Sequence, residues 1–325
     1  MRLAEPLKIA VLLPCHNEEL AIGQTIASFR NALPSAEIYV YDNNSTDRTA
    51  AVAASAGAIV RHEPTRGKGS VIRRMFADVS ADFYVIADGD ATYDASSASS
   101  MLELASREGL DMVVGCRRPT SLAAYRPGHR LGNRLLTALL SAFFGQSFTD
   151  ILSGYRVFSN RFVKSFPSFS SGFEIETEIS VHALRMRIPV SEVNTPYHPR
   201  PEGSSSKLSK YKDGVYILST IFNLVRQERP LFFFGSAGVI LAMASIILAI
   251  PVVTTYLQTG LVPRLPTAVL STAMMLLAFL FGFSGLILDT VVRGRREMFR
   301  MHYLSLSPPS SYVSTSRGGL ADEIV

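Results

Sequence analysis

The first 230 residues alternate short apolar runs with segments whose apolar positions recur at helical spacing. The apolar runs predict strands at residues 8–14, 37–42, 58–63, 82–88 and 111–117. The segments between them predict helices over 19–33, from Ser45 or Thr46 to Gly57, over 67–79 and over 96–109. Strands that alternate with helices form a mostly parallel sheet with helices on both faces, so the pattern predicts an α/β fold.

The pattern changes near residue 230, where two long uncharged stretches begin. They span residues 231–253 and 265–288, and each exceeds the roughly 20 residues that cross a hydrocarbon core of about 30 Å. We therefore expect a transmembrane hairpin within 231–292. Arginines flank its two outer ends, at positions 226, 229, 293, 295, 296 and 300. The positive-inside rule places both outer ends, and the preceding domain, in the cytosol.

Two further segments combine basic residues with apolar residues at helical spacing. Residues 207–230 predict an amphipathic juxtamembrane helix, and residues 129–145 predict either a membrane-surface helix or a core-facing one. The Ser-, Pro- and Gly-rich end of the chain predicts a disordered tail. The expected organisation is a globular domain over 1–206, the juxtamembrane helix over 207–230, the hairpin over 231–292 and a basic, then disordered, cytosolic tail over 293–325.

Composition narrows the partners and the compartment. The chain has 325 residues, 47% of them hydrophobic, and a net charge of +5. A mild basic excess suits a membrane surface or phosphorylated substrates, and we expect no nucleic-acid partner. Cys15 and Cys116 are the two cysteines and form no CxxC pair, which indicates a reducing compartment. Glu5 and Lys8 interrupt the amino-terminal apolar run, so no signal peptide is expected.

Candidate chemistry gathers where the predicted strands end. Asp88 and Asp90 follow the fourth strand; such a pair is either an ordinary turn or a site for Mg²⁺ or Mn²⁺, which bind carboxylates together with diphosphate oxygens. Other polar residues follow neighbouring strands or open a glycine-rich turn: Asn17, Glu18, Asp42, Asp47, Arg66, Lys68 and Arg117. Because ligands bind at the carboxyl ends of parallel strands, these residues predict a phosphate- and metal-binding site.

The motifs PCHNEE, YDNNSTD, RGKG, DGD, GCR and DILSGYRVFS together resemble the family-2 GT-A glycosyltransferases. Among these they are most similar to the polyprenyl-phosphate sugar synthases, the dolichol-phosphate mannosyltransferase type and its bacterial undecaprenyl-phosphate relatives. The resemblance covers roughly residues 8–215, and the hairpin matches the bacterial arrangement. It implies a GT-A (Rossmann-like) domain in the inner (cytoplasmic) membrane, a nucleotide sugar (a UDP-sugar) as donor, a polyprenyl (undecaprenyl) phosphate as acceptor, and a homo-oligomer.

The resemblance also implies roles for individual residues. The nucleotide-sugar positions are Pro14, His16, Glu18, Val40, Asp42, Lys68, Asp88, Gly89, Asp90 and Arg117. Asp88 and Asp90 match the metal motif, and Arg117 matches the arginine behind the diphosphate. Arg200 and Lys207 match the acceptor loop, which is one residue longer here, and Glu178 matches a core carboxylate. The family usually has tyrosine where His16 stands.

A mechanism follows from ordinary chemistry. The metal on Asp90, together with Arg117 and Lys68, would stabilise the charge on the departing diphosphate. A lipid phosphate acceptor is already anionic and needs cations rather than a strong base. The candidate cations are Arg126, Arg130, Arg200 and Lys207. The expected reaction is an inverting transfer that yields a lipid-linked monosaccharide, used as a donor for modification of envelope glycans.

Asp150, in the DILSGYRVFS motif, is open to three interpretations. It orders the acceptor loop together with Ser153 and Arg156, it forms a structural ion pair with Arg156, or it is a general base. A base, Asp150 or Glu178, would be needed if the acceptor were a non-phosphate lipid or a growing glycan. A non-catalytic, nucleotide-binding membrane scaffold is a further alternative. A processive polysaccharide synthase is disfavoured because the chain has no tryptophan and therefore no QxxRW motif.

Overall fold

The computed structural model describes residues 7–120, 137–138, 148–168, 172, 174–201, 219, 222–223 and 225–309. The chain divides into two compact units, one of Met1–Asp213 with Arg300–Val325 and one of Gly214–Phe299. The predicted amphipathic segments over 129–145 and 207–230 lie mostly outside the described residues.

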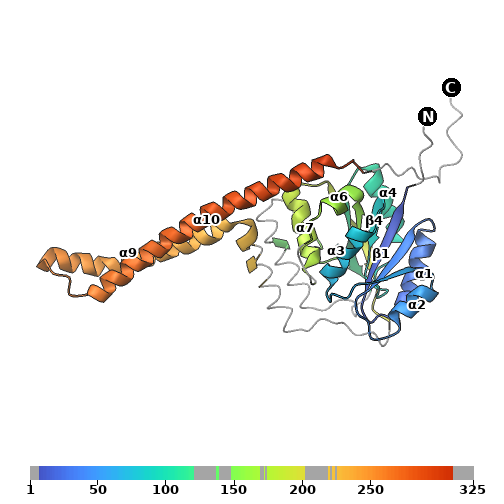
Figure 1. Ribbon diagram of the computed structural model, residues 1–325, viewed down its shortest axis with the longest axis horizontal. Helices are drawn as coiled ribbons and strands as arrows, with labels where there is room; N and C mark the ends of the chain where they lie inside the picture. The colour runs from blue at the N-terminus through green and yellow to red at the C-terminus, as the bar shows by residue number, and fades with distance from the viewer. Residues whose placement is uncertain are drawn as a thin grey trace, which may run out of the picture. The chain divides into compact units, whose positions relative to one another are not determined.

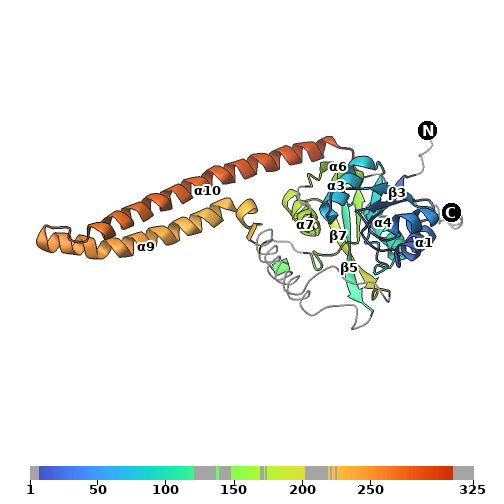
Figure 2. The same cartoon turned by 60° about the horizontal axis from the view of Figure 1, so that its bottom comes forward.

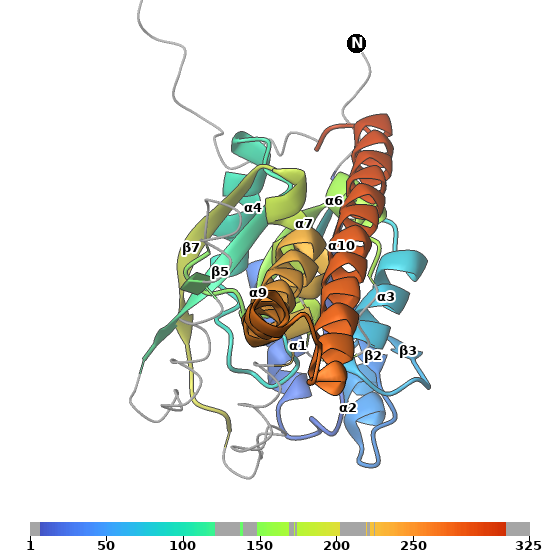
Figure 3. The same ribbon diagram turned by 90° about the vertical axis from the view of Figure 1, so that its left-hand side faces the viewer.

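A seven-stranded sheet forms the centre of the first unit. The strands are β1 (Ile9–Cys15), β2 (Glu37–Asp42), β3 (Ile59–His62), β4 (Phe83–Ile86), β5 (Met112–Pro119), β6 (Arg156–Ser159) and β7 (Val190–Tyr197). Their order is β3-β2-β1-β4-β6-β5-β7, and β6 alone runs antiparallel to its neighbours. Figure 3 shows β5 and β7 side by side on one flank of the sheet and β2 and β3 on the other. The carboxyl ends of the six parallel strands therefore share one edge.

Helices cover both faces of this sheet, as the alternating pattern predicted (Figures 1 and 2). They are α1 (Ile22–Ala32), α2 (Thr49–Ser55), α3 (Lys68–Asp78), α4 (Ser97–Arg107), α6 (Asn160–Ser165) and α7 (Ile175–Met186). The prediction of Ser45 or Thr46 as the cap of α2 is wrong. The carboxylate of Asp47 accepts the bond from the Thr49 amide instead (2.9 Å), because Ser45 and Thr46 are already bonded to Asn17.

The two faces of the sheet have different cores. Apolar side chains of α1 and α4, such as Phe29 and Met101, pack with alternate residues of the strands on one face. Aromatic rings dominate the other face: Phe76 lies edge-on against Phe158, and Phe162 continues the cluster. The His182 ring of α7 also lies edge-on against Phe162. Burial on both faces explains why the strands read as continuous apolar runs.

His182 makes the stability of this unit sensitive to acid. Burial, and secondarily the charge of Arg185, lowers the pKa of His182 to about 3. The unfolded chain takes up a proton near pH 6.5, whereas the folded chain does not until about pH 3. Stability is therefore lost as the pH falls through this window. We expect wild type to lose about 2–3 kcal/mol more than His182→Phe between pH 6.5 and 4.5.

The measurement is the melting temperature of both proteins across that pH range, in the same detergent. Phenylalanine keeps the edge-on ring contacts but cannot be protonated. Parallel decline of the two melting temperatures would contradict the assignment.

The second unit contains the helix α9 (Pro230–Thr259) and most of the helix α10 (Leu265–Ser305), which pack against each other (Figure 1). Both are long and apolar enough to cross a membrane, and only 11% and 17% of their most apolar windows are buried. That exposure distinguishes them from the core helices of soluble proteins. The stretch predicted to span the membrane at 265–288 is helical and forms part of a longer helix that continues to Ser305.

Small residues line the contact between the two helices. A side chain at Gly238 would meet the carbonyl oxygen of Ala278 at 2.9 Å, and the Ser245 hydroxyl donates to the carbonyl of Ser271 (2.7 Å). Close approach through small residues is how helices associate in lipid. Near the outer ends, the Arg296 guanidinium donates to the Glu228 carboxylate (3.1 Å). The hairpin is therefore a packed unit in its own right.

Candidate active site

The site lies at the carboxyl edge of the sheet, where β4 is followed by Ala87, Asp88, Gly89 and Asp90. Asp90 is 2% exposed, and one of its carboxylate oxygens accepts bonds from the Thr92 amide (3.2 Å) and hydroxyl (2.6 Å). Burial and the charge of Asp88 raise the pKa of the Asp90 carboxyl, while Arg200 and Thr92 act in the opposite direction. The turn thus presents a carboxylate that needs a cationic partner.

Arg200, which follows β7, supplies that partner. Its guanidinium lies 2.6 Å from Asp90 Oδ2 and 3.7 Å from Glu18 Oε1. A residue that the sequence assigned to the acceptor therefore contacts two residues that it assigned to the donor and the metal. The donor and acceptor parts of the predicted site meet at this arginine.

Lys68, at the start of α3, is the cationic partner of Asp88. Its ammonium lies 2.5 Å from Asp88 Oδ1 and 2.6 Å from Glu176 Oε1. Burial acts to lower the pKa of Lys68, but the charges of Asp88 and Glu176 outweigh it and raise the pKa above its ordinary value. Lys68 is therefore a permanently charged group inside the protein. The sequence analysis missed Glu176, because this residue reaches the edge only through packing between segments that are far apart in the chain.

Asn43 holds the glycine-rich turn that precedes Lys68. Its side-chain amide donates to the carbonyls of Glu63 (2.9 Å) and Thr65 (2.8 Å) and accepts from the Gly67 amide (2.8 Å). Gly67 has φ +125°, a conformation that favours glycine. The sequence signal for Asn43 was its place directly after β2, within YDNNSTD. It is a positioning residue that our sequence analysis did not single out.

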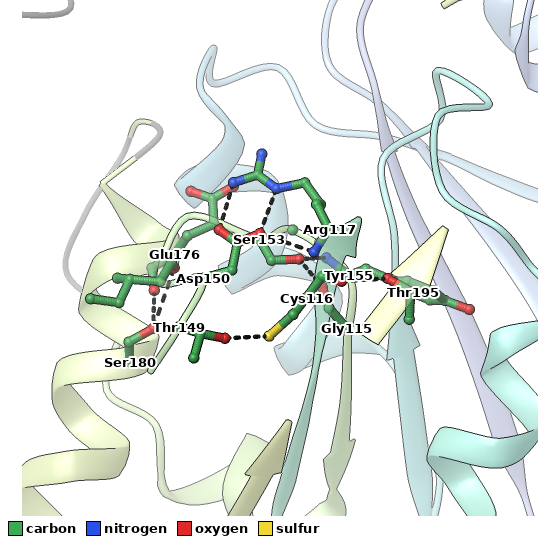
Figure 4. A network of polar contacts seen from close by, with 12 residues as sticks. Gly115, Cys116, Arg117, Thr149, Asp150, Ser153, Tyr155, Glu176, Ser180 and Thr195 are labelled. Carbon is green, nitrogen blue, oxygen red and sulfur yellow. Dashed lines mark hydrogen bonds and ion pairs between the residues drawn. The ribbon is translucent and has the colours of Figure 1, made fainter. Parts of the chain in front are cut away.

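Arg117, near the end of β5, forms a two-point ion pair with Asp150 (Figure 4). Arg117 Nε lies 2.7 Å from Asp150 Oδ2, and Nη2 lies 2.7 Å from Oδ1. Burial raises the pKa of Asp150, but its bonds to Arg117 outweigh this and hold the pKa below its usual range. Glu192 of β7 fixes the neighbouring turn by accepting from the Thr149 amide (2.7 Å). Asp150 is thus a weak base in this arrangement.

The structural ion pair between Asp150 and Arg156, one of the three interpretations left open above, does not form. Arg156 is 2% exposed and donates to the carbonyls of Ile151, Ser153 and Glu176. Burial lowers its pKa to about 10, so it stays charged at neutral pH. Carbonyl oxygens around this guanidinium fix the turn that carries Asp150.

The predicted nucleotide residues surround the ends of β1 and β2. Pro14 and His16 are partly exposed there, and His16 Nδ1 is a buried atom with no hydrogen-bond partner in the described part of the chain. Asp42 accepts from the Ser45 amide (3.3 Å) and contacts the His62 ring (3.2 Å). The Val40 side chain is fully buried in the core, within a part of β2 that pairs with both β1 and β3.

Position 89, between the two aspartates, requires glycine because the structure leaves no room for a side chain there. A Cβ at this position would overlap Cys15 Sγ and lie 3.3 Å from Ile22 Cδ1. We expect Gly89→Ala to destabilise the protein by about 1–3 kcal/mol, as overpacking does. Combining Gly89→Ala with Cys15→Ala should recover part of the lost stability, because the smaller side chain makes room for the new methyl group. A double-mutant cycle of melting temperatures measures this recovery. Independent, additive effects would contradict this packing.

The donor set fits a hard divalent cation that arrives with a diphosphate. The residues that the structure describes contain no group of three or more potential protein ligands for a metal. Mg²⁺ usually takes one or two carboxylates and completes its shell with phosphate oxygens and water. Asp88 and Asp90 supply such a pair. Arg66 is exposed, and Arg126, Arg130 and Lys207 lie outside the described residues.

Comparisons with known proteins agree with this geometry. Residues 10–166 match the family model described as glycosyl transferase family 2. The glycosyltransferase AglJ of Haloferax volcanii is 33% identical over 301 residues, which are 91% of this chain and 97% of that protein. A dolichyl-phosphate hexose transferase of the same organism is 24% identical over 221 residues, 68% of this chain and 95% of that one.

Solved structures show the same architecture. The glucosyl-3-phosphoglycerate synthase of Mycobacterium tuberculosis, crystallised with Mn²⁺, uridine diphosphate and glucosyl-3-phosphoglycerate, matches with a TM-score of 0.55. It is 24% identical and covers 67% of this chain and 79% of its own. The predicted GT-A-like fold, a mostly parallel sheet followed by two apolar helices, is confirmed.

Proposed function

Because this chain belongs to glycosyltransferase family 2, we propose that it transfers a sugar from a UDP-sugar to a polyprenyl phosphate, with inversion at the anomeric carbon. The product is a polyprenyl-phosphate-linked monosaccharide that serves as a donor for envelope glycans. The two apolar helices anchor the enzyme in the cytoplasmic membrane, with the catalytic domain on the cytosolic side. The arginines that flank the helices support this orientation.

One observation carries the choice of acceptor. Three aspartates at the carboxyl edge each have a cationic partner: Asp88 pairs with Lys68, Asp90 with Arg200 and Asp150 with Arg117. A hydroxyl acceptor would need a carboxylate that can take up a proton, and the low pKa of Asp150 opposes that role. A phosphate acceptor is an anion already and requires cations instead. The membrane anchor and the dolichyl-phosphate hexose transferase relative support the same choice.

The residues divide the work as follows. Asp88 and Asp90 hold Mg²⁺ or Mn²⁺, which neutralises charge on the nucleotide diphosphate, and the Mn²⁺ and uridine diphosphate bound by the mycobacterial structure support this. Arg117 adds positive charge behind the leaving group. Arg200 orients the acceptor phosphate, together with Arg126, Arg130 and Lys207. His16, Glu18 and Asp42 surround the nucleoside.

The test follows nucleotide diphosphate release by the purified protein with a panel of UDP- and GDP-sugars. Undecaprenyl phosphate is compared with undecaprenol, which has the same chain but lacks the phosphate. We expect release with one donor, only with the phosphorylated lipid and only without EDTA. Equal release with undecaprenol would favour a hydroxyl acceptor and contradict the proposal. Nucleotide binding without release on any lipid would favour the scaffold.

A further inference from the structure

Lys68 is shared between two carboxylates from different parts of the chain. Asp88 follows β4, whereas Glu176 lies in the first turn of α7, and both oxygens are within 2.6 Å of the ammonium. The Lys68 and Glu176 side chains are 9% and 8% exposed, against 32% for Asp88. Asp88 is therefore the partner that faces the site, and Glu176 is the partner on the protein side.

The surroundings of this arrangement are mostly apolar and tightly fitted. The space around Lys68 and Glu176 is lined by Ile72, Ile86, Phe158 and Ile179, together with Arg156. Gly154 closes it, because a Cβ there would lie 2.9 Å from the ammonium and 3.1 Å from Asp88 Oδ2. The Glu176 carbonyl accepts from Arg156 (3.1 Å) and from the Ser180 hydroxyl (2.9 Å), which fixes this turn of α7. Lys68 consequently has little room to move toward solvent.

We propose that Glu176 is a positioning residue that keeps Lys68 paired when Asp88 turns to a divalent cation. An ammonium left without an anionic partner in such a place is strongly destabilising. With Glu176 present, Asp88 can exchange Lys68 for the metal while Lys68 retains one carboxylate. Without that second carboxylate, metal binding at Asp88 would leave the ammonium unpaired. This inference rests on the proposed metal site at Asp88 and Asp90.

The experiment measures Mn²⁺ affinity directly, from the electron paramagnetic resonance signal of free Mn²⁺, in the presence of UDP and without sugar or lipid. Glu176→Gln should raise the Kd for Mn²⁺ about tenfold. Added to Lys68→Met, the same Glu176→Gln change should alter the Kd by less than about threefold, since no ammonium then remains to be stranded; comparison with Lys68→Met alone cancels the loss of the Lys68 contact with the diphosphate. Glu103→Gln, at an exposed position of α4, is the control for loss of one negative charge and should match wild type.

Melting temperatures separate this role from a purely structural one. A structural glutamate would lower the melting temperature of Glu176→Gln and leave the Kd of the folded protein unchanged, and that result would overturn the inference. A tenfold loss of affinity when Glu176→Gln is added to Lys68→Met would overturn it too, because Glu176 would then not act through Lys68. If wild type itself fails to bind Mn²⁺ with UDP, the proposed metal site falls together with this inference. If wild type binds Mn²⁺ with UDP and Glu176→Gln has the same Kd, only this inference is contradicted and the proposed metal site stands.

Discussion

Asp90→Asn is expected to reduce sugar transfer by at least about a thousandfold while the protein stays folded. The change removes the negative charge that would hold the metal, and stabilisation of the leaving diphosphate is lost with it. Asparagine has nearly the same shape, and its carbonyl oxygen can still accept both bonds from Thr92. Arg200 keeps Glu18 as a second carboxylate. The fold should therefore tolerate the change far better than the chemistry does.

The measurement compares initial rates of nucleotide diphosphate release and the Mn²⁺ affinity of both proteins. Asp94→Asn is the matched control, because Asp94 accepts from the Ser96 and Ser97 hydroxyls at the start of α4. It should lower the melting temperature slightly and leave the rate within about threefold of wild type. An Asp90→Asn protein that retains a tenth of the wild-type rate would rule out the metal assignment.

Arg200→Gln is expected to produce two opposite effects. Transfer should fall about a hundredfold, because the acceptor phosphate loses a guanidinium that can bind it at two points. Mn²⁺ binding in the absence of nucleotide should become tighter, because the guanidinium that occupies Asp90 Oδ2 at 2.6 Å no longer competes with the metal. A residue that acted only on the acceptor would change the first quantity and not the second.

Arg118→Gln is the control for this pair of measurements. Arg118 lies beside Arg117 on β5, and its guanidinium donates to Asn194 at an exposed position (2.8 Å). Removing it changes the net charge equally and should affect neither the transfer rate nor the Mn²⁺ affinity. If Arg200→Gln weakens Mn²⁺ binding, Arg200 does not compete with the metal, and the two halves of the site are not coupled through it.

The parallel part of the fold could be predicted from the sequence because burial on both faces leaves a visible apolar run. All five predicted strands are present within a few residues of their expected bounds. β6 was missed because two of its four residues, Arg156 and Ser159, are polar yet buried. β7 (Val190–Tyr197) was missed because most of its residues are partly exposed and because Glu192 and Pro196 interrupt any apolar run. Both segments form strands because of their contacts with neighbouring strands and not because of a local sequence pattern.

The candidate site was likewise predictable only in part from the sequence. Asp88, Asp90 and Lys68 could be found because each follows or opens an element of the predicted sheet. The pairing of these residues could not, since it depends on contacts between distant segments. Arg200 meets Asp90 across 110 positions, and Glu176 meets Lys68 across 108. The pairing of Asp150 with Arg117 rather than Arg156 likewise depends on a contact between segments 33 positions apart.

The reversed direction of β6 also places both ends of one connection at the ligand edge of the sheet. β5 ends at the ligand edge with Pro119, and β6 begins at the same edge with Arg156. The connection therefore begins and ends at this edge, and close to its end Asp150 and Ser153 bond to Arg117 and Gly115 of β5. If this connection carries the acceptor contacts proposed above, chimaeras that exchange residues 121–147 and keep residues 148–155 should change lipid preference and retain the sugar donor.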